Sequence, residues 1–204
     1  MSALAADHPQ GHSHEWEELV RLWEETDAPE GCKVEIIEGI VTVSPAPANQ
    51  HNSIAWKLQR QLTNVIPEDW GLYQTLAVAI PARSGVYIPD LVVAPETVVD
   101  ASIEEAVNES ENYIQASAAS FICEITSKTN ARHDRISKPA GYARAGVPLY
   151  LLIDRWAPGG PTITLYGEPG DDVYRVLQAG KFGDDIHLPA PFDLVIDTSS
   201  FPLR

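Results

Sequence analysis

Two short runs of apolar residues in this chain each contain a single carboxylate. Asp90 stands in VYIPDLVV and Glu124 stands in SFICEIT. Apolar runs of this length predict buried strands, and a buried carboxylate is costly unless a cation or hydrogen bonds compensate for it. Either residue alone could end its strand or pair with a basic side chain. Two in neighbouring strands favour a shared partner, and a divalent metal is one natural candidate.

Helical and strand patterns alternate around these runs. Apolar spacing predicts a helix from Glu15 to about Pro29, a second over residues 49–65 and a third over residues 133–145. Strands are predicted for the hairpin VEIIEGIVTVSP, for residues 73–80 and 86–93, for SFICEIT and LYLLID, and for residues 162–166, 173–177 and 185–188. This mixed order predicts an α/β fold with a central mixed β-sheet flanked by helices and a β-rich C-terminal part.

The chain has 204 residues, of which 44% are hydrophobic, and this suffices for one globular domain. We expect that domain over residues 15–204. Residues 1–14 are polar and small, which predicts a disordered tail. Its three histidines could bind a metal, but nothing in a tail would orient them: His8, His12 and His14.

Composition excludes several classes of protein. No run is apolar enough to span a membrane, and the first residues lack the pattern of a secretory signal. Cys32 and Cys123 stand alone, which excludes a disulfide scaffold and a zinc ribbon. We therefore expect a cytoplasmic protein. The formal net charge of -15 excludes a bulk nucleic-acid coat protein, because it repels polyanions at long range.

One basic cluster interrupts this acidic chain. Between residues 128 and 144 the only acid is Asp134, among five bases: Lys128, Arg132, Arg135, Lys138 and Arg144. Separated from the acidic segments, these side chains suit contacts with phosphates. The arginines could equally be ordinary surface charge.

Side chains near Glu124 share faces of their predicted elements. In a strand, Glu124 and Thr126 point the same way, and the carbonyl of Ile125 can lie nearby. Such a face could hold a hydrated hard cation through oxygen ligands, as Mg²⁺ prefers.

The predicted third helix carries a second polar stripe. Asp134, Lys138 and Tyr142 follow one another at i, i+4 and i+8. A solvated ion pair, worth a few tenths of a kcal/mol, is the alternative interpretation of the first two. Pro139 follows Lys138 directly, so the helix is expected either to start near Ser137 or to be kinked there.

Several motifs occur together and in a fixed order: VEIIEGIVTVSPAP, then His51, then IPDLVV, then EITSKTNARHDRISKPAGYARAGVPLYLLID. Over roughly residues 15–204 this combination resembles the Uma family of endonucleases, within the PD-(D/E)xK restriction-endonuclease-like superfamily. The resemblance implies a restriction-endonuclease-like core. It also implies a metal-dependent endonuclease that hydrolyses DNA phosphodiester bonds with Mg²⁺ or Mn²⁺.

The resemblance further implies catalytic roles for individual residues. Asp90 and Glu124 would be catalytic metal ligands on adjacent strands, close enough to share one ion, and Glu35 could complete the metal site. The superfamily's usual lysine position is Thr126 here, so Lys138 would take over that role from the helix. Substituting Lys138 is then expected to abolish cleavage with little effect on the fold. Lys128 is a weaker candidate for the same role.

The remaining implied roles are supporting ones. Four residues would assist the site: His51, whose role the resemblance does not assign, and Thr126, Asp134 and Tyr142. Four would contact DNA: Lys128, Arg132, Arg135 and Arg144. Members of the family tend to form homodimers, and DNA binding by so few bases is expected to be weak and sensitive to salt.

Two other functions stay open. One is a catalytically inactive nuclease-fold protein with a regulatory or protein-binding role, which the net charge and Pro139 favour. The other is a ligand-binding module unrelated to phosphate chemistry. That second function explains neither the buried carboxylates nor the basic cluster.

Overall fold

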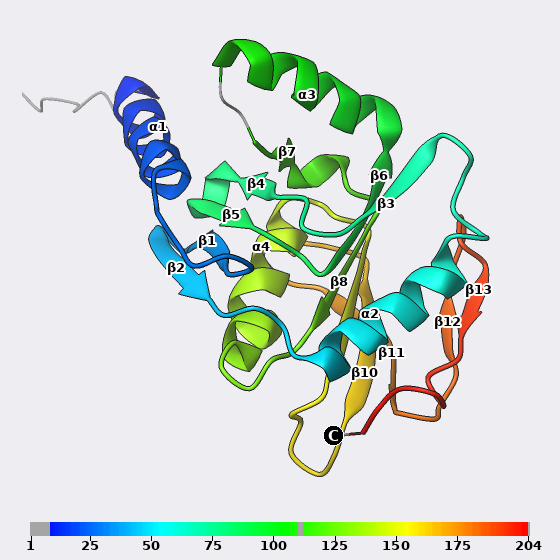
Figure 1. Ribbon diagram of the computed structural model, residues 1–204. Coiled ribbons are helices and arrows are strands. Elements are labelled where there is room, and N and C mark those ends of the chain that lie inside the picture. Colours follow the sequence, from blue (N-terminus) through cyan, green and yellow to red (C-terminus); the bar gives the residue numbers. More distant parts are fainter. Residues whose placement is uncertain (1–8, 110–111, 204) are drawn as a thin grey trace, which may run out of the picture.

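The computed structural model describes residues 9–109 and 112–203, which form two β-sheets, a two-stranded ribbon and several helices (Figure 1). The larger sheet contains, in spatial order, β11 (Arg175–Lys181), β10 (Thr162–Gly167), β9 (Leu149–Asp154), β8 (Phe121–Ile125), β6 (Leu91–Pro95) and β3 (Trp70–Tyr73). Strands β8 and β9 are parallel and all other neighbours are antiparallel. The predicted mixed sheet is confirmed.

The smaller sheet contains β2 (Ile40–Ser44), β1 (Lys33–Ile37), β5 (Gly85–Tyr87), β4 (Val78–Ile80) and β7 (Ile114–Gln115). The predicted hairpin forms β1 and β2. Its two-residue turn places Glu38 and Gly39 at φ 52° and 79°, the positive values that such hairpin turns require. The ribbon consists of β12 (Ile186–Leu188) and β13 (Leu194–Ile196).

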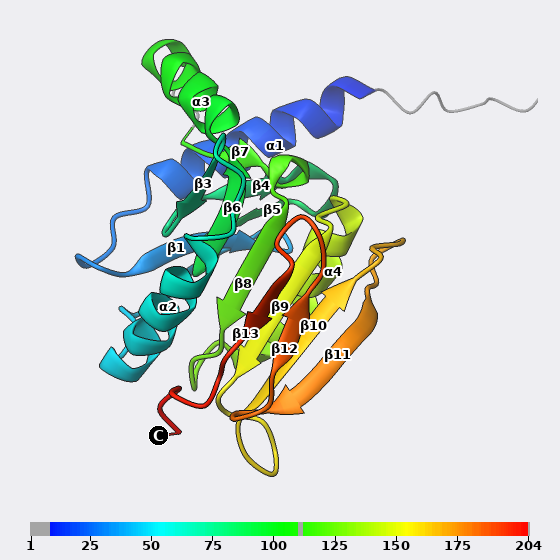
Figure 2. The same ribbon diagram turned by 90° about the vertical axis from the view of Figure 1, so that its right-hand side faces the viewer.

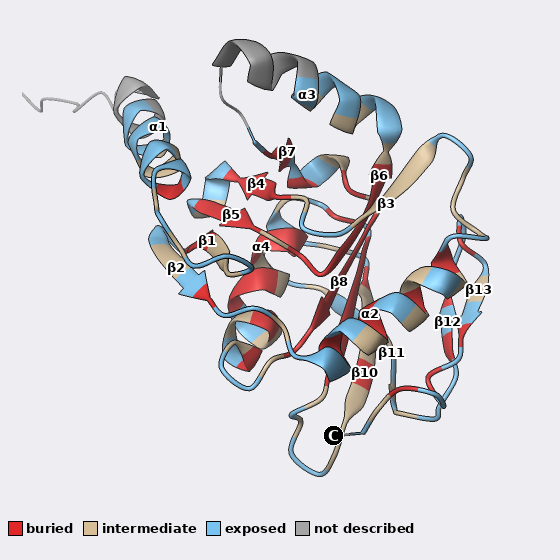
Figure 3. Cartoon of the chain, viewed as in Figure 1, coloured by how far each residue is buried: buried red, intermediate tan, exposed pale blue. Residues whose placement is uncertain are grey.

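The helices are α1 (Pro9–Glu24), α2 (Asn49–Leu62), α3 (Glu96–Glu109) and α4 (Lys138–Arg144). Helix α2 and the ribbon pack on one face of the larger sheet, while α4 and the smaller sheet pack on its other face (Figure 2). Helix α1 packs on the smaller sheet through a third apolar cluster. The central strands of the larger sheet, β6, β8 and β9, are therefore buried on both faces (Figure 3).

The alternation of side chains along β8 decides where its carboxylate points. Phe121, Cys123 and Ile125 belong to the core beneath α2, whereas Ile122 belongs to the core shared with α4. Glu124 lies two residues from Ile122 and thus faces α4 and the smaller sheet. The central strand consequently brings a carboxylate between the two sheets.

Several predicted boundaries differ from the structure. Helix α1 begins at Pro9, so residues 9–14, predicted as tail, are helical, while residues 1–8 lie outside the described residues. Helix α2 ends at Leu62 rather than Val65. The predicted strands 73–80 and 86–93 each divide into two strands that join different sheets. The acidic segment 97–119 contains most of α3, all of β7 and a 3₁₀ turn at residues 116–118.

A π-turn precedes α4. Residues 133–137 are π-helical, and the backbone N–H of Lys138 donates to the carbonyl of His133, five residues back. In the same pattern Pro139 has no N–H to donate to the carbonyl of Asp134, and the hydroxyl of Tyr150 donates to that carbonyl instead, at 2.7 Å. The helical backbone is continuous over residues 131–144, so the predicted start near Ser137 is not found, and the π-turn accommodates Pro139 inside the helix.

We expect Gly141→Ala to destabilise the protein. At an exposed helix position without close neighbours, this change would raise the free energy of unfolding by about 1 kcal/mol. A Cβ on Gly141 would lie 2.7 Å from the ring of the fully buried Tyr87 and 3.1 Å from Ile80 Cδ1, so the sign should reverse to a loss of about 1–3 kcal/mol. Chemical denaturation measures this change, and an unchanged or higher stability would contradict the close packing of α4 on the smaller sheet.

Among the described residues, no helix combines the length and apolarity needed to cross a lipid bilayer.

Candidate active site

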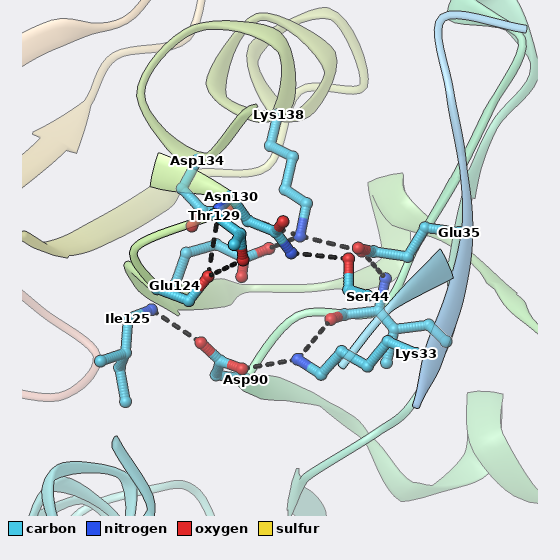
Figure 4. Close-up of polar contacts among 12 residues, drawn as sticks. Lys33, Glu35, Ser44, Asp90, Glu124, Ile125, Thr129, Asn130, Asp134 and Lys138 are labelled. Atoms are coloured by element: carbon cyan, nitrogen blue, oxygen red, sulfur yellow. Dashed lines mark hydrogen bonds and ion pairs between the residues drawn. The ribbon is translucent and has the colours of Figure 1, made fainter. Parts of the chain in front are cut away.

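Charged side chains from both sheets and two helices meet at one cavity of about 170 Å³ (Figure 4). Strand β1 supplies Lys33 and Glu35, the residue before β6 is Asp90, and β8 supplies Glu124. The π-turn, α4 and α2 supply Asp134, Lys138 and His51. The structure thus brings together all three residues predicted as catalytic.

The ammonium group of Lys138 lies at the point where three carboxylates converge. Its Nζ is 2.8 Å from Glu35 Oε1, 3.0 Å from Glu124 Oε1 and 3.5 Å from Asp134 Oδ1. Lys138 is only 3% exposed, so it is a buried residue and not the solvated or surface-to-cleft lysine that the sequence predicted. Burial alone would lower its pKa, but the three carboxylates outweigh that effect and raise the pKa well above its usual value.

Glu124 and Asp134 are only partly compensated by this lysine. Burial raises the pKa of Glu124 to about 8, although Lys138 opposes the shift. Burial likewise raises the pKa of Asp134 to about 6 against the effect of Lys138. The hydroxyl of Tyr142 donates to Glu124 Oε1 at 2.6 Å, which holds the carboxylate in place. Both carboxyl groups are therefore easier to protonate than in water, Glu124 more so than Asp134.

Asp90 is bound by a second set of groups. The Nζ of Lys33 is 2.5 Å from its Oδ1 and His51 Nε2 is 3.1 Å away, while the backbone N–H of Ile125 donates to Oδ2 at 2.7 Å. Burial would raise the pKa of Asp90, but Lys33 and His51 outweigh it and hold the pKa well below its usual range. The Ile125 contact links Asp90 directly to the strand that carries Glu124.

The donor set of this cavity suits a hard divalent cation. With every acid ionised, four carboxylates face two lysines, which leaves two uncompensated negative charges: Glu35, Asp90, Glu124 and Asp134 against Lys33 and Lys138. Carboxylate oxygens are the ligands that Mg²⁺ prefers. Within residues 9–109 and 112–203, no three His, Cys, Asp or Glu side chains already form a ligand group. The carboxylates suit the ion in chemistry, but in this arrangement Asp90 contacts Lys33 and Glu124 contacts Lys138.

Other predicted residues lie elsewhere. Thr126 follows the end of β8 and does not line this cavity; its hydroxyl donates to Asp154 Oδ1 at 3.1 Å. Arg135 also binds Asp154, at 2.7 Å, and Arg144 pairs with the exposed Asp171 at 3.3 Å. Strand β8 ends at Ile125, one residue before the end of the predicted strand.

The predicted basic cluster is therefore divided. Lys138 is buried among acids, and Arg135 and Arg144 have acidic partners. Lys128 and Arg132 are exposed, and neither forms an ion pair with another described residue. These last two are the members of the cluster that are free to contact phosphates.

Sequence reasoning missed Lys33. Strand alternation could have found it, because Lys33 stands directly before the predicted hairpin, two residues from Glu35, and shares its face once the strand starts one residue earlier. Ser44 and Asn130 also line the cavity, where the Asn130 side-chain amide donates to Ser44 Oγ at 2.6 Å. No pattern in the sequence singles out this second pair.

The fold resembles that of a solved structure described as "a putative nuclease belonging to DUF820" from Anabaena variabilis. The two share 16% sequence identity with a TM-score of 0.65, over 91% of this chain and 96% of that one. The molecule therefore has a mixed α/β fold found in a structure of that class. A family model described as "putative restriction endonuclease", Uma2, matches residues 16–199, and the chain belongs to this family. A search of curated proteins found no significant match.

The raised pKa of Glu124 predicts how stability depends on pH. A carboxyl whose pKa rises from 4.5 to about 8 on folding contributes stability that is fully present below pH 4.5 and lost as pH rises to about 8. Glu124→Gln imitates the protonated group. The free energy of unfolding of the native protein should fall by up to ~1.4 kcal/mol per pH unit over this range because of Glu124, and this part of the fall should be absent in the variant. Denaturation of both proteins at pH 5 and pH 8.5 measures the difference.

A matched control for this comparison is Glu168→Gln. Glu168 is exposed and pairs with Arg175 at 3.0 Å on the surface. It should change stability little at either pH. Identical pH dependence in Glu124→Gln and the native protein would contradict the charge balance described for the cavity.

Proposed function

We propose that the chain is a Mg²⁺- or Mn²⁺-dependent endonuclease that hydrolyses DNA phosphodiester bonds. The observation that carries the proposal is the buried cavity in which four carboxyl groups face two lysines, in a chain of this family. Asp90 and Glu124 would hold the ion, with Glu35 able to complete its oxygen ligands. A bound divalent ion supplies polarisation of the phosphate and a more acidic water.

The protein's own groups would orient and balance this site. Lys138 keeps a positive charge beside Glu124, where it can stabilise the charge that develops on a reacting phosphate. His51 and the Ile125 N–H fix Asp90, and Tyr142 fixes Glu124. These contacts hold the two carboxylates in orientation before substrate arrives, which supports a catalytic role for the site.

A second function deserves a test because one observation favours it. Each carboxylate predicted to bind metal already contacts a lysine, Asp90 with Lys33 and Glu124 with Lys138. Metal-ligand candidates that are already paired in this way, in a chain with a net charge of -15, fit a catalytically inactive nuclease-fold protein with a regulatory or protein-binding role. The two functions differ in whether the chain cuts DNA.

Cleavage of supercoiled plasmid tests the proposal. The native protein should nick or linearise the plasmid with Mg²⁺ or Mn²⁺ and should not do so in EDTA. Glu124→Gln should be inactive at equal folded concentration, and Glu168→Gln should match the native protein. If folded native protein cuts no substrate with either metal, the inactive function becomes the better one.

DNA binding should be weak and should fall as salt rises. With two free cations, Lys128 and Arg132, the slope of log K against log salt should be about −2 per subunit. Lys128→Met should reduce the slope by about 1. A slope near zero for tight binding would contradict phosphate contacts at these residues.

We further propose a homodimer located in the cytoplasm, as the sequence and the family resemblance lead us to expect. Light scattering at micromolar concentration tests the assembly, and a monomeric mass would contradict it.

A further inference from the structure

A second cavity, of about 270 Å³, opens beside the first. The two share four lining residues: Lys33, Pro47, His51 and Asp90. Its other walls come from one face of α2 and from the segment that follows β3. A ligand with a phosphate near Asp90 could therefore extend from the first cavity into the second.

An exposed tryptophan forms one wall of this second cavity. Trp56 is 53% exposed, although tryptophan usually buries most of its ring. The guanidinium of Arg60 lies 4.9 Å from the ring centroid, and Arg60 does not line the cavity. The cation thus covers the ring from outside the cavity and leaves an aromatic surface available within it.

Side-chain amides surround this ring. Asn52, Trp56 and Gln59 follow at i, i+4 and i+7 on one face of α2. Across the cavity, the Gln74 amide donates to Gln59 Oε1 at 3.1 Å. Gln59 Nε2 and the side-chain oxygen Gln74 Oε1 bind no other described residue, so the pair offers one donor and one acceptor, the two groups that glutamine uses on base edges.

The backbone is strained at the rim of the same cavity. Thr75 has φ 58°, in the left-handed region, which a β-branched residue rarely adopts. Its hydroxyl donates to the carbonyl of Gln74 at 2.6 Å. Strained residues of this kind cluster at ligand sites, because the surrounding structure must hold them in place.

We propose that this second cavity binds one unpaired nucleobase of the DNA whose phosphate occupies the first cavity. Trp56 stacks on the base, and Gln59 and Gln74 bind its edge. The volume lies below the ~300–1,000 Å³ of pockets for drug-sized ligands, which suits a single base. A base inside a duplex already stacks on its neighbours, so only an extruded or single-stranded base can enter. This inference rests on the proposed function for its substrate.

Binding without cleavage tests the inference. In EDTA, three duplexes are compared: one with a single extrahelical 2-aminopurine, one with an abasic residue at that position and one fully paired. The native protein should bind the first duplex about 5- to 150-fold more tightly than the other two, the range expected for stacking of one base. Fluorescence of the 2-aminopurine should fall on binding, because it stacks on Trp56.

The chain offers a matched control in Trp156. Trp156 is 44% exposed and lies beside Arg155, with a guanidinium-to-ring distance of 5.9 Å, but it does not line the cavity. Trp56→Ala should abolish the preference for the unpaired base, Trp56→Phe should restore part of it, and Trp156→Ala should keep all of it.

A single-stranded oligonucleotide tests the other source of an unpaired base, and tighter binding to it than to the extrahelical duplex would identify single strands as the substrate.

The outcomes separate this inference from the nuclease proposal. Equal affinity of the native protein for all three duplexes, an absence of binding, or an equal loss in Trp156→Ala overturns the base site. Cleavage in Mg²⁺ without any preference for the unpaired base would retain the nuclease and discard the base site. A preference without cleavage would retain the base site and discard the nuclease.

Discussion

Replacing Lys138 with methionine is expected to lower the free energy of unfolding by about 3–5 kcal/mol at pH 8. The buried ammonium lies within 3.5 Å of three carboxylates, which lose their shared cation together in this variant: Glu35, Glu124 and Asp134. If Lys138 were instead solvated on the helix surface, its replacement would lower the free energy of unfolding by only a few tenths of a kcal/mol. Chemical denaturation distinguishes these two magnitudes.

The loss should shrink as pH falls. Asp134 and Glu124 already have pKa values raised to about 6 and about 8, and removal of the lysine raises them further. Stability from such groups is fully present below their unfolded values and is lost as pH rises through the folded ones. At pH 5, Glu124 and Asp134 of the variant are therefore largely protonated and the deficit is smaller. Equal stability of Lys138→Met and the native protein at pH 8 would contradict the buried cluster.

Lys128→Met is the control for both stability and activity. Lys128 is exposed, so its stability should stay within about 0.5 kcal/mol of the native value. Assayed on plasmid at a temperature where both variants are folded, Lys138→Met should lose metal-dependent cleavage and Lys128→Met should retain most of it. Full activity in Lys138→Met would remove that residue from the mechanism, and inverted effects would transfer the role to Lys128.

Asp90→Asn is expected to abolish most of the response to divalent metal. The native protein should unfold at a higher temperature in millimolar Mg²⁺, because an ion that binds only the folded chain stabilises it, by about 2.7 kcal/mol at 100 times Kd. The amide oxygen of asparagine can still accept from the Ile125 N–H, but the charge is lost. Cleavage should fall by more than ~100-fold, beyond the loss that removing an outer-shell partner of a metal produces.

A buried aspartate outside the cavity provides the matched control. Asp154 binds Arg135 at 2.7 Å and Thr126 at 3.1 Å, and it does not line the site. Asp154→Asn should lower the stability without metal but keep the full increase that Mg²⁺ causes. An unchanged metal response in Asp90→Asn, with scanning fluorimetry as the measurement, would place the ion elsewhere.

The sequence predicts the strands that carry the site better than the contacts among its residues. The apolar run around Glu124 identifies β8, because a strand buried on both faces has few polar residues. The two runs on either side of Ser84 mislead, because each combines two short strands: Thr75 turns the chain between β3 and β4, and Pro89 lies between β5 and β6. Local hydropathy contains no information about which sheet each strand joins.

The burial of Lys138 could not be predicted for a related reason. Its spacing from Asp134 fits an exposed ion pair as well as a buried one. What excludes water is β1, which brings Glu35 against the helix, and which also brings Lys33 to Asp90, 57 residues away in the chain. Contacts between segments so far apart arise from the packing of one sheet on the other, which no local pattern encodes.

The π-turn before α4 makes the arrangement of charges depend on the length of this segment. Removing one residue from 133–137 would replace the five-residue hydrogen bonds of the π-turn with the four-residue hydrogen bonds of an α-helix. The segment would then be a more regular helix. The same deletion would rotate Asp134 relative to Lys138 and take the carbonyl of Asp134 away from the hydroxyl of Tyr150. A one-residue deletion would therefore favour the stability of the helix but disrupt the cavity. A homologue one residue shorter here would keep the fold and lose the arrangement of charges.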